Sequence, residues 1–190
     1  VEFRCGVEVG EDITIAQLRE QGYKAFYIAI GAQGGRMTGV PGEDAVGVET
    51  GVDFLRRVNL NEEGVKLSGK TVVIGGGNVA VDVARTALRT GSSEVSMFCL
   101  ESRDIMPAAD DEVAEAEEEG ITVNNSWGPK EILTENGKVT AVVLKKCISV
   151  LDENKRFAPK YDEEELLTVP CDQVLLSIGQ SIKWGALLEG

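Results

Sequence analysis

Three small residues at fixed spacing, Gly75, Gly77 and Ala80, form the clearest chemical pattern in the sequence. They follow the apolar run 71–74 and open a segment whose apolar residues have helical spacing. In such a pattern the first glycine permits a sharp turn, the second lets a pyrophosphate approach the backbone, and the small third residue lets helix and strand pack closely. The amino end of the helix adds N–H donors and the positive end of its dipole. In this context the pattern predicts a dinucleotide site.

The candidate phosphate-binding residues are the turn and the start of the helix: Gly75, Gly76, Gly77, Asn78, Val79 and Ala80. Two alternatives remain open for such a turn. It can serve packing alone, or it can be the glycine turn of a methyltransferase. A methyltransferase usually has an acidic residue just before the first glycine, where this sequence has Ile74. Dinucleotide binding is therefore the favoured interpretation.

The residues that follow the next predicted strand indicate which dinucleotide is expected. Glu101 stands 24 residues after Gly77. A carboxylate there accepts hydrogen bonds from both ribose hydroxyls of the adenosine and repels a 2′-phosphate, so NAD(H) is favoured over NADP(H). Glu101, Ser102 and Arg103 are candidate cofactor-binding residues. Arg103 keeps NADP(H) open, because a guanidinium can bind a 2′-phosphate or lie across adenine. Glu101 can also be a surface residue at a strand end.

The composition restricts the partner and the chemistry. The net charge of −13, from 32 acidic and 19 basic residues, argues against nucleic acid or an anionic membrane surface as a partner. The sequence contains no histidine. The absence of histidine argues against a hydrolase or a sugar dehydrogenase that needs a general base. We expect no catalytic side chain in this sequence.

The four cysteines, Cys5, Cys99, Cys147 and Cys171, stand far apart, without the spacing of a metal site or a redox pair. They are expected to be reduced thiols packed as small apolar groups. No apolar run reaches the roughly 20 residues that cross a bilayer, and no signal peptide is present. We expect a cytoplasmic protein. The start on Val1 rather than Met suggests a fragment of a longer protein.

Apolar patterns predict the elements that hold these residues. Ahead of the turn they indicate a strand over 1–9, a helix that Thr14 caps and Gly22 ends, and a second strand over 25–35. A turn-rich connection over 36–47 follows. A helix is then expected over 49–58, with Val52, Leu55 and Val58 on one stripe, and a polar loop over 61–69. The helix after the turn is expected over 78–89, with Val79, Val83 and Ala87 facing inward and Gly91 closing it.

The second half of the chain continues this alternation and then changes. A strand over 93–100, an acidic helix over 108–120 with Val113 and Ala116 inward, and a strand over 121–126 predict an α/β fold with a parallel sheet and right-handed crossovers. The remaining signals predict a hairpin with its turn at 135–137, a charged loop or hairpin tip over 151–165, and a buried strand over 171–179.

Several of these motifs are shared with a known group. IGGGNVAVDVARTALR, ESRDIMPA and LLSIGQ resemble the NAD(P)H-binding region of the glutamate synthase small-subunit-like flavoproteins. That group includes the flavin half of dihydropyrimidine dehydrogenase and the large subunit of ferredoxin-dependent transhydrogenases. YIAIGAQGGRMTGVPGEDAVGVETGVDFL is similar to the group's passage from flavin domain to nucleotide domain. The likeness covers essentially the whole sequence.

The resemblance implies one of the two dinucleotide-binding domains of this flavoprotein fold, a Rossmann-like nucleotide domain with a hairpin insertion and flanking pieces of the FAD domain. The implied parts are an FAD-domain stub over 1–34, a connection and leading helix over 35–70, the NAD(P)H-binding domain over 71–177 with its hairpin region at 127–170, and a return stub over 178–190. The FAD glycine turn would precede residue 1. Gly31 would lie at the domain boundary.

The resemblance also implies a function. NAD(P)H would pass a hydride to FAD in the full-length protein, and electrons would continue to an iron–sulphur domain or a partner subunit. This step needs two rings held face to face rather than a proton-transfer residue, which fits a sequence without histidine. Ile178 and Gly179 would lie near the nicotinamide. NADPH users in the group commonly have two arginines where this sequence has Leu100 and Glu101.

The isolated chain is expected to be inactive and to hold no FAD. The alternative function is a stand-alone Rossmann module that binds and senses NAD(H) without catalysis.

Overall fold

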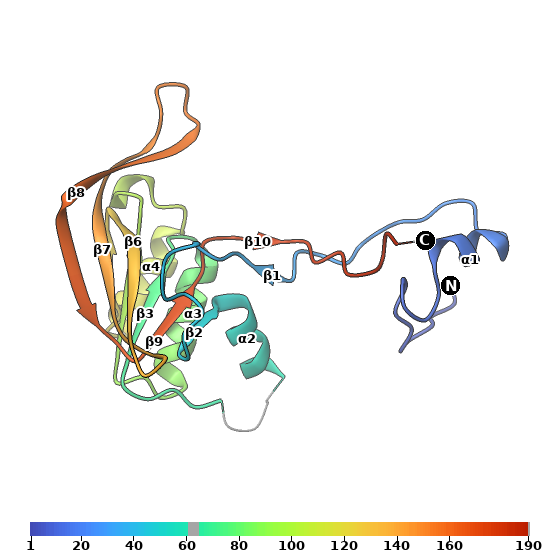
Figure 1. Ribbon diagram of the computed structural model, residues 1–190, viewed down its shortest axis with the longest axis horizontal. Helices are drawn as coiled ribbons and strands as arrows, with labels where there is room; N and C mark the ends of the chain where they lie inside the picture. Colours follow the sequence, from blue (N-terminus) through green and yellow to red (C-terminus); the bar gives the residue numbers. More distant parts are fainter. Residues whose placement is uncertain (61–64, 190) are drawn as a thin grey trace. The chain divides into compact units, whose positions relative to one another are not determined.

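The computed structural model describes residues 1–60 and 65–189, and these divide into two compact units (Figure 1). Unit 1 comprises Val1–Gly34 with Ser181–Gly190, and unit 2 comprises Gly35–Gln180. Part of the polar loop expected over 61–69 lies outside the described residues. In the described part of the chain, no helix is long and apolar enough to cross a membrane.

A five-stranded parallel sheet forms the centre of unit 2, as the alternation of strand and helix predicted. Its strands, in spatial order, are β2 (Val48–Thr50), β9 (Gln173–Leu176), β3 (Lys70–Ile74), β4 (Glu94–Cys99) and β5 (Thr122–Asn125). The central strands carry the runs Val72–Ile74 and Val174–Leu176, which are buried. Continuous apolar runs are typical of parallel strands that are covered on both faces.

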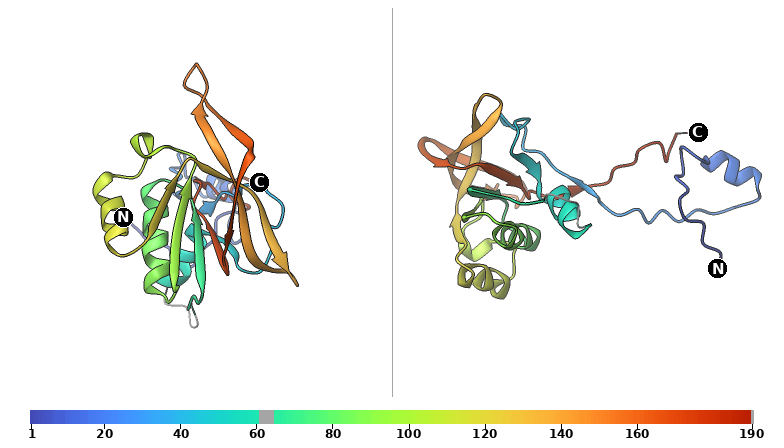
Figure 2. Two further views of the ribbon diagram at one scale, coloured as in Figure 1. Left: turned by 90° about the vertical axis from the view of Figure 1, so that its left-hand side faces the viewer. Right: turned by 90° about the horizontal axis from the view of Figure 1, so that it is seen from below.

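Each face of the parallel sheet has its own core, because successive side chains of a strand point to opposite faces. Val73, Met97 and Leu175 point toward the helices α2 (Gly51–Asn59), α3 (Asn78–Arg89) and α4 (Asp110–Glu118). Val72 and Val174 point to the other face, where they pack with residues of a second sheet. Figure 2 shows the parallel sheet between the helices and this second sheet.

The second sheet is antiparallel and has three strands, β6 (Trp127–Glu135), β7 (Lys138–Leu151) and β8 (Phe157–Pro170). The predicted hairpin turn joins β6 and β7, with Asn136 at φ 51° and Gly137 at φ 75°. The charged segment 151–165 is a tip only over 152–156, since residue 151 ends β7 and residues 157–165 belong to β8. The outer parts of β7 and β8, residues 147–161, form an extension that we call the arm (Figure 1).

Helix α3 has the predicted bounds, but one predicted inward side chain is wrong. Val83 and Ala87 are buried, whereas Val79 is 38% exposed. Val79 lines a cavity at the start of the helix instead of packing against the sheet, whereas Ala80 and Val81 beside it are buried. In α2, Gly51 and Phe54 are buried, whereas the predicted stripe of Val52, Leu55 and Val58 is only partly buried. Val113 and Ala116 of α4 face inward, as predicted.

Unit 1 departs from the sequence prediction. Helix α1 (Ile15–Glu20) has the predicted capping box, in which the Thr14 side chain accepts from the Gln17 N–H and the Gln17 side chain accepts from the Thr14 N–H. The strands predicted over 1–9 and 25–35 are absent, apart from one bridge at Val9 and the short β1 (Gly34–Gly35).

The exposed side chains of unit 1 give the reason for this difference. Phe3 is 84% and Tyr27 is 94% exposed. A strand needs a neighbour for its backbone hydrogen bonds and its apolar face, and among the described residues only β1 finds one, in β10 (Gln180–Ser181).

Candidate functional site

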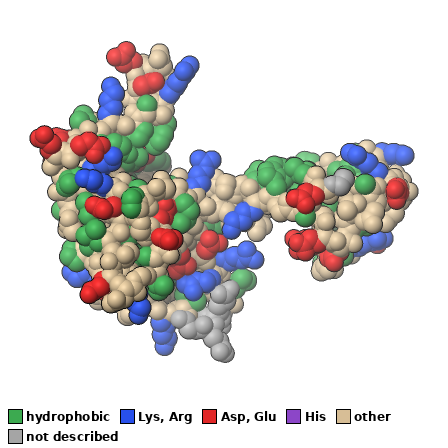
Figure 3. All heavy atoms as spheres, in the orientation of Figure 1, with side chains coloured by type: hydrophobic (Ala, Val, Ile, Leu, Met, Phe, Trp, Pro, Cys, Tyr) green, Lys and Arg blue, Asp and Glu red, His purple; other side chains and the backbone are tan. Residues whose placement is uncertain are grey.

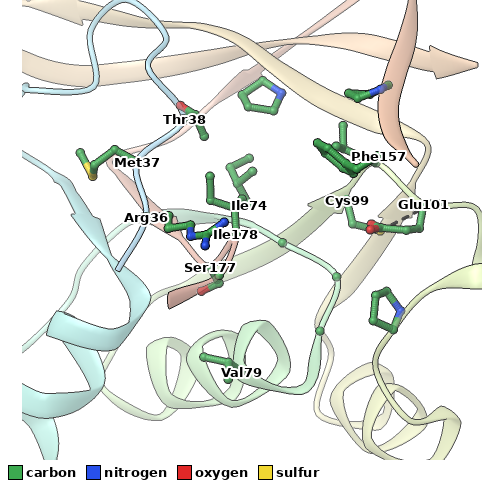
Figure 4. Close-up of a pocket in the computed structure, with 18 of the residues that line it drawn as sticks. Arg36, Met37, Thr38, Ile74, Val79, Cys99, Glu101, Phe157, Ser177 and Ile178 are labelled. Atoms are coloured by element: carbon green, nitrogen blue, oxygen red, sulfur yellow. Dashed lines mark hydrogen bonds between the residues drawn. The ribbon is translucent and has the colours of Figure 1, made fainter. Parts of the chain in front are cut away.

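A cavity of about 760 Å³ lies in unit 2 at the carboxyl ends of three parallel strands (Figure 4). The segments that follow β3, β4 and β9 all line it: Gly75–Gly77, Leu100–Glu101 and Ser177–Gly179. Carboxyl ends of parallel strands meet at one edge of a sheet, which is where open α/β sheets bind ligands. The structure therefore brings together turn residues, Glu101, Ile178 and Gly179 that lie far apart in sequence.

Each of the three turn positions has a different environment for its glycine. Gly75 has φ 148°, and a Cβ atom there would overlap the carbonyl group of Ser177. A Cβ at Gly76 would stand 2.8 Å from the Cβ of Cys99 and 3.0 Å from Oε2 of Glu101. Gly77 has an ordinary extended backbone, at φ −97° and ψ 172°, and a Cβ there would meet no atom within 4 Å.

The empty space at Gly77 is what a ligand site requires. Neither backbone strain nor packing demands a glycine at this position, so its missing side chain serves to leave room at the start of α3. Gly77 is the N-cap of α3 and provides no side-chain acceptor for the first N–H groups of the helix. Free N–H groups and a positive dipole end attract a phosphate. The residues present therefore fit a pyrophosphate.

Asn78 and Ala80 hold the turn in place. The side-chain oxygen of Asn78 accepts a hydrogen bond of 2.9 Å from the N–H of Ala109, at the start of α4. The carbonyl of Gly76 accepts another of 2.9 Å from the N–H of Ala108. Ala80 is fully buried and lets α3 pack closely. The side-chain oxygen of Asn78 is thus engaged within the protein, while its backbone N–H lies in the first turn of α3.

Of the three residues predicted after β4, the structure brings only Glu101 to the cavity. Its carboxylate lies over Gly76, and its carbonyl accepts a hydrogen bond of 2.9 Å from the N–H of Ser126. Ser102 caps the short helix η1 (Arg103–Ile105), and neither it nor Arg103 lines the cavity. The guanidinium of Arg103 stands 3.7 Å from the carboxylate of Glu117 on α4.

The opposite end of the cavity contains Ile178 and Gly179 together with a segment that sequence reasoning missed. Figure 4 shows Arg36, Met37, Thr38 and Ile178 on the side away from Glu101. The N–H of Arg36 donates to the carbonyl of Gly179 over 3.1 Å. This contact depends on the pairing of β1 with β10, which are distant in sequence, so no local pattern indicated it.

A second wall of the cavity was also missed. It consists of residues from β6 and β8: Trp127, Pro129, Phe157, Pro159 and Tyr161. The three β8 residues alternate along the strand and so share one face. This alternation was a detectable signal, but it lies within the charged stretch 151–165, which the sequence analysis assigned to a loop or tip.

The cysteines of the described structure are unpaired, and one of them reaches the cavity. All four are free thiols. Cys99 lines the cavity, and burial, followed by the negative charge of Glu101, raises its pKa to about 11. Cys147 and Cys171 are buried as predicted, whereas Cys5 is exposed because no strand forms over 1–9. Among the described residues, no group of three or more Cys, Asp or Glu side chains is arranged to hold a metal ion.

The chain is similar in sequence and fold to known proteins. The family model described as pyridine nucleotide-disulphide oxidoreductase matches residues 4–186. The NADP(+)-dependent formate dehydrogenase subunit beta of Moorella thermoacetica is 37% identical over 185 residues, which cover 95% of this chain and 26% of that protein. The glutamate synthase [NADPH] small chain of Halomonas elongata is 34% identical, over 94% of this chain and 40% of that protein.

A relative named for NAD is also similar. The NAD-dependent dihydropyrimidine dehydrogenase subunit PreT of Escherichia coli K12 is 29% identical, over 100% of this chain and 40% of that protein. These relatives confirm the resemblance found in the sequence. The chain spans less than half the length of each of them.

Among solved structures, FprA of Mycobacterium tuberculosis in complex with NADPH superposes with a TM-score of 0.79 at 25% identity. The superposition covers 92% of this chain and 54% of FprA. It confirms the predicted fold class, that of flavoproteins with two dinucleotide-binding domains.

Proposed function

The chain belongs to the pyridine nucleotide-disulphide oxidoreductase family, and we propose that its unit 2 is the domain that binds NAD(H) in a flavoprotein oxidoreductase. The observation that carries the proposal is the open space at Gly77, at the amino end of α3 and inside the cavity. No side chain of the described residues lies within 4 Å of the position that a Gly77 Cβ would take. A pyrophosphate would fit this space and accept hydrogen bonds from the free N–H groups of the helix.

Each part of the cavity has a role in this proposal. The turn residues Gly75–Gly77 and the first N–H groups of α3 hold the pyrophosphate, while Glu101 accepts hydrogen bonds from the adenosine ribose. Ile178, Gly179 and Arg36 flank the nicotinamide end. When bound, NADH supplies a hydride that moves with its electron pair to an FAD in the full-length protein. The chain's own residues position the nucleotide and need not exchange a proton at that step.

We infer a preference for NAD(H) over NADP(H) from the cavity rather than from the relatives. The names of the relatives reported above include both cofactors. The carboxylate of Glu101 is held close to Gly76. A 2′-phosphate on a ribose bound beside this carboxylate would be repelled by its negative charge. Arg103, the cation that would favour NADP(H), lies beside Glu117 and does not line the cavity.

The remaining segments complete the proposal. The residues outside unit 2, 1–34 and 181–190, would belong to the FAD domain, which would pass electrons to an iron–sulphur domain or partner subunit. The exposed apolar side chains of unit 1, Phe3 and Tyr27 among them, support this assignment, because large exposed apolar groups are typical of surfaces that another domain covers.

Thermal unfolding with added nucleotide tests the proposed function. A ligand that binds only the folded state stabilises it, by about 2.7 kcal/mol at a hundred times its Kd. We expect NADH to raise the Tm of the 190-residue chain in a concentration-dependent way, and the purified chain to retain no FAD. Unchanged melting with both NADH and NADPH would contradict nucleotide binding, and tight retention of FAD would contradict the assignment of the stubs.

A further inference from the structure

The arm presents one apolar face to the cavity. Phe157, Pro159 and Tyr161 lie at alternate positions of β8, and all three line the cavity with Leu100 and Glu101. Phe157 is 69% exposed although it faces the cavity. Figure 3 shows hydrophobic side chains along the arm beneath charged residues at its tip. A large aromatic ring left exposed at the edge of a concave site is suited to cover a flat apolar ligand group.

Hydrogen bonds fix the base of the arm relative to Glu101. The N–H of Ser126 donates to the carbonyl of Glu101, and the N–H of Cys147 on β7 donates to the carbonyl of Ser126, both over 2.9 Å. Cys147 pairs with Tyr161 of β8. Two backbone hydrogen bonds and one strand pair therefore connect the carboxylate residue to the apolar face of β8.

Packing at Gly128 brings the same two segments together. A Cβ atom at Gly128 would stand 2.6 Å from Cδ2 of Leu100 and 2.7 Å from Cε1 of Tyr161. Only a glycine leaves room for both side chains there. The ammonium of Lys145 lies 4.1 Å from the centre of the Tyr161 ring, which further restricts that ring. Tyr161 is thus packed within the protein, whereas Phe157, four residues outward on the same face, is not.

The arm lies at the end of the cavity where the adenosine half of a dinucleotide is expected. In Figure 4, Phe157 is drawn on the side of Cys99 and Glu101, whereas Arg36 and Ile178 lie on the other side. Resting on the proposed function, in which Glu101 holds the adenosine ribose, we propose that Phe157 stacks on the adenine base. The arm then serves as the adenine-binding wall of the site, and Phe157 becomes buried when the nucleotide is bound.

Affinity measurements with two nucleotides test this role. NADH and ADP-ribose share the adenosine diphosphate, but only NADH carries a nicotinamide. Stacking of a base on an aromatic side chain contributes enough that Phe157→Ala should weaken both nucleotides in parallel, by about tenfold or more. Phe157→Trp should keep wild-type affinity. Ile148→Ala is the matched control, since Ile148 is 68% exposed on the same arm but does not line the cavity.

The outcomes separate this inference from the function on which it rests. Parallel loss in Phe157→Ala, with Ile148→Ala unchanged, supports the adenine wall. Wild-type affinity of Phe157→Ala for ADP-ribose, or equal losses in Phe157→Ala and Ile148→Ala, overturns it while NADH binding by the wild type stands. Failure of the wild-type chain to bind either nucleotide overturns both proposals.

Discussion

In the proposed site, Glu101 is the residue through which the cavity would distinguish NAD(H) from NADP(H). Its carboxylate is held over the glycine turn because Gly76 has no side chain, and its backbone is fixed by Ser126. A carboxylate in this place bonds two ribose hydroxyls and repels a phosphate. The specificity of the site therefore depends on one charge whose position is set by the neighbouring strand ends.

Reversing this charge should reverse the preference. In Glu101→Arg a ribose partner is lost and a phosphate partner is gained, a change worth on the order of 1–3 kcal/mol in relative affinity. We expect the wild type to prefer NADH and the variant to prefer NADPH, as measured by separate calorimetric titrations. Glu101→Gln, which removes the charge and adds no cation, should fall between them. An unchanged preference would remove Glu101 from the site.

The buried thiols predict how stability depends on pH. Burial raises the pKa of Cys99 to about 11 and that of Cys171 to about 12, whereas an unperturbed thiol has a pKa near 8.5. Between these values the unfolded chain loses protons that the folded chain keeps, so the free energy of unfolding falls as pH rises. We expect the urea midpoint to be level below about pH 8 and to fall between about pH 8.5 and 10.

A double variant provides the control. Cys99→Ala with Cys171→Ala should be less stable at neutral pH, because both side chains are buried. Its urea midpoint should nevertheless fall less steeply with pH than that of the wild type. Equal slopes in the two proteins would show that other groups produce the alkaline loss.

At the scale of elements, the site depends on contacts between the glycine turn and the start of α4. The turn can hold its shape because the Asn78 side chain and the Gly76 carbonyl accept the N–H groups of Ala109 and Ala108. These bonds join two helix starts on the same edge of the sheet. The geometry of the proposed phosphate site is thus a property of α3 and α4 together.

Substitution of Asn78 should separate stability from binding. Asn78→Ala leaves the N–H of Ala109 without this acceptor and should lower the free energy of unfolding by about 1 kcal/mol. Asn78→Asp keeps the acceptor, so its stability should match that of the wild type, but its charge beside the pyrophosphate should weaken NADH. Urea unfolding and NADH titration of both variants check this. Equal stability of Asn78→Ala and the wild type would show that the bond is not needed.

Elements with local signals could be predicted from the sequence, and elements that depend on distant partners could not. Helix α3 was predicted with its bounds, because the glycine turn and the spacing of Val83 and Ala87 are local features. The strands over 1–9 and 25–35 were predicted from their apolar patterns, but among the described residues they find no neighbouring strand apart from the pairing of β1 with β10 and the bridge at Val9. The cavity wall on β8 was missed because its position depends on the long antiparallel pairing with β7, which includes register shifts.

At the largest scale, unit 2 consists of a parallel sheet with helices on one face and an antiparallel sheet on the other (Figure 2). Both layers supply residues to one cavity: the parallel sheet provides the turn and Glu101, and the antiparallel sheet provides the apolar wall. The sequence indicated the polar half of the site, since glycine spacing and a carboxylate are recognisable in one dimension. The apolar wall carries a short alternation on β8, but its position at the cavity depends on the packing of the two sheets.

Of the glycines in the turn, Gly77 allows the central claim to be tested without destroying the fold, whereas Gly75 does not. At Gly75 any side chain would be strained and would overlap Ser177, so loss of binding in Gly75→Ala could follow from loss of structure. At Gly77 the backbone is ordinary and the space is open. Serine is a good N-cap residue, so Gly77→Ser should keep or slightly raise the Tm of the protein. Its hydroxyl would nevertheless occupy the phosphate position and engage the helix N–H groups.

The most direct measurement is therefore a calorimetric titration of NADH into the wild-type chain and into Gly77→Ser, with thermal melts of both proteins. We expect the variant to melt no lower than the wild type and to bind NADH at least about tenfold more weakly, the equivalent of 1.4 kcal/mol. Equal affinity in a folded variant would contradict the claim that the pyrophosphate lies at the start of α3.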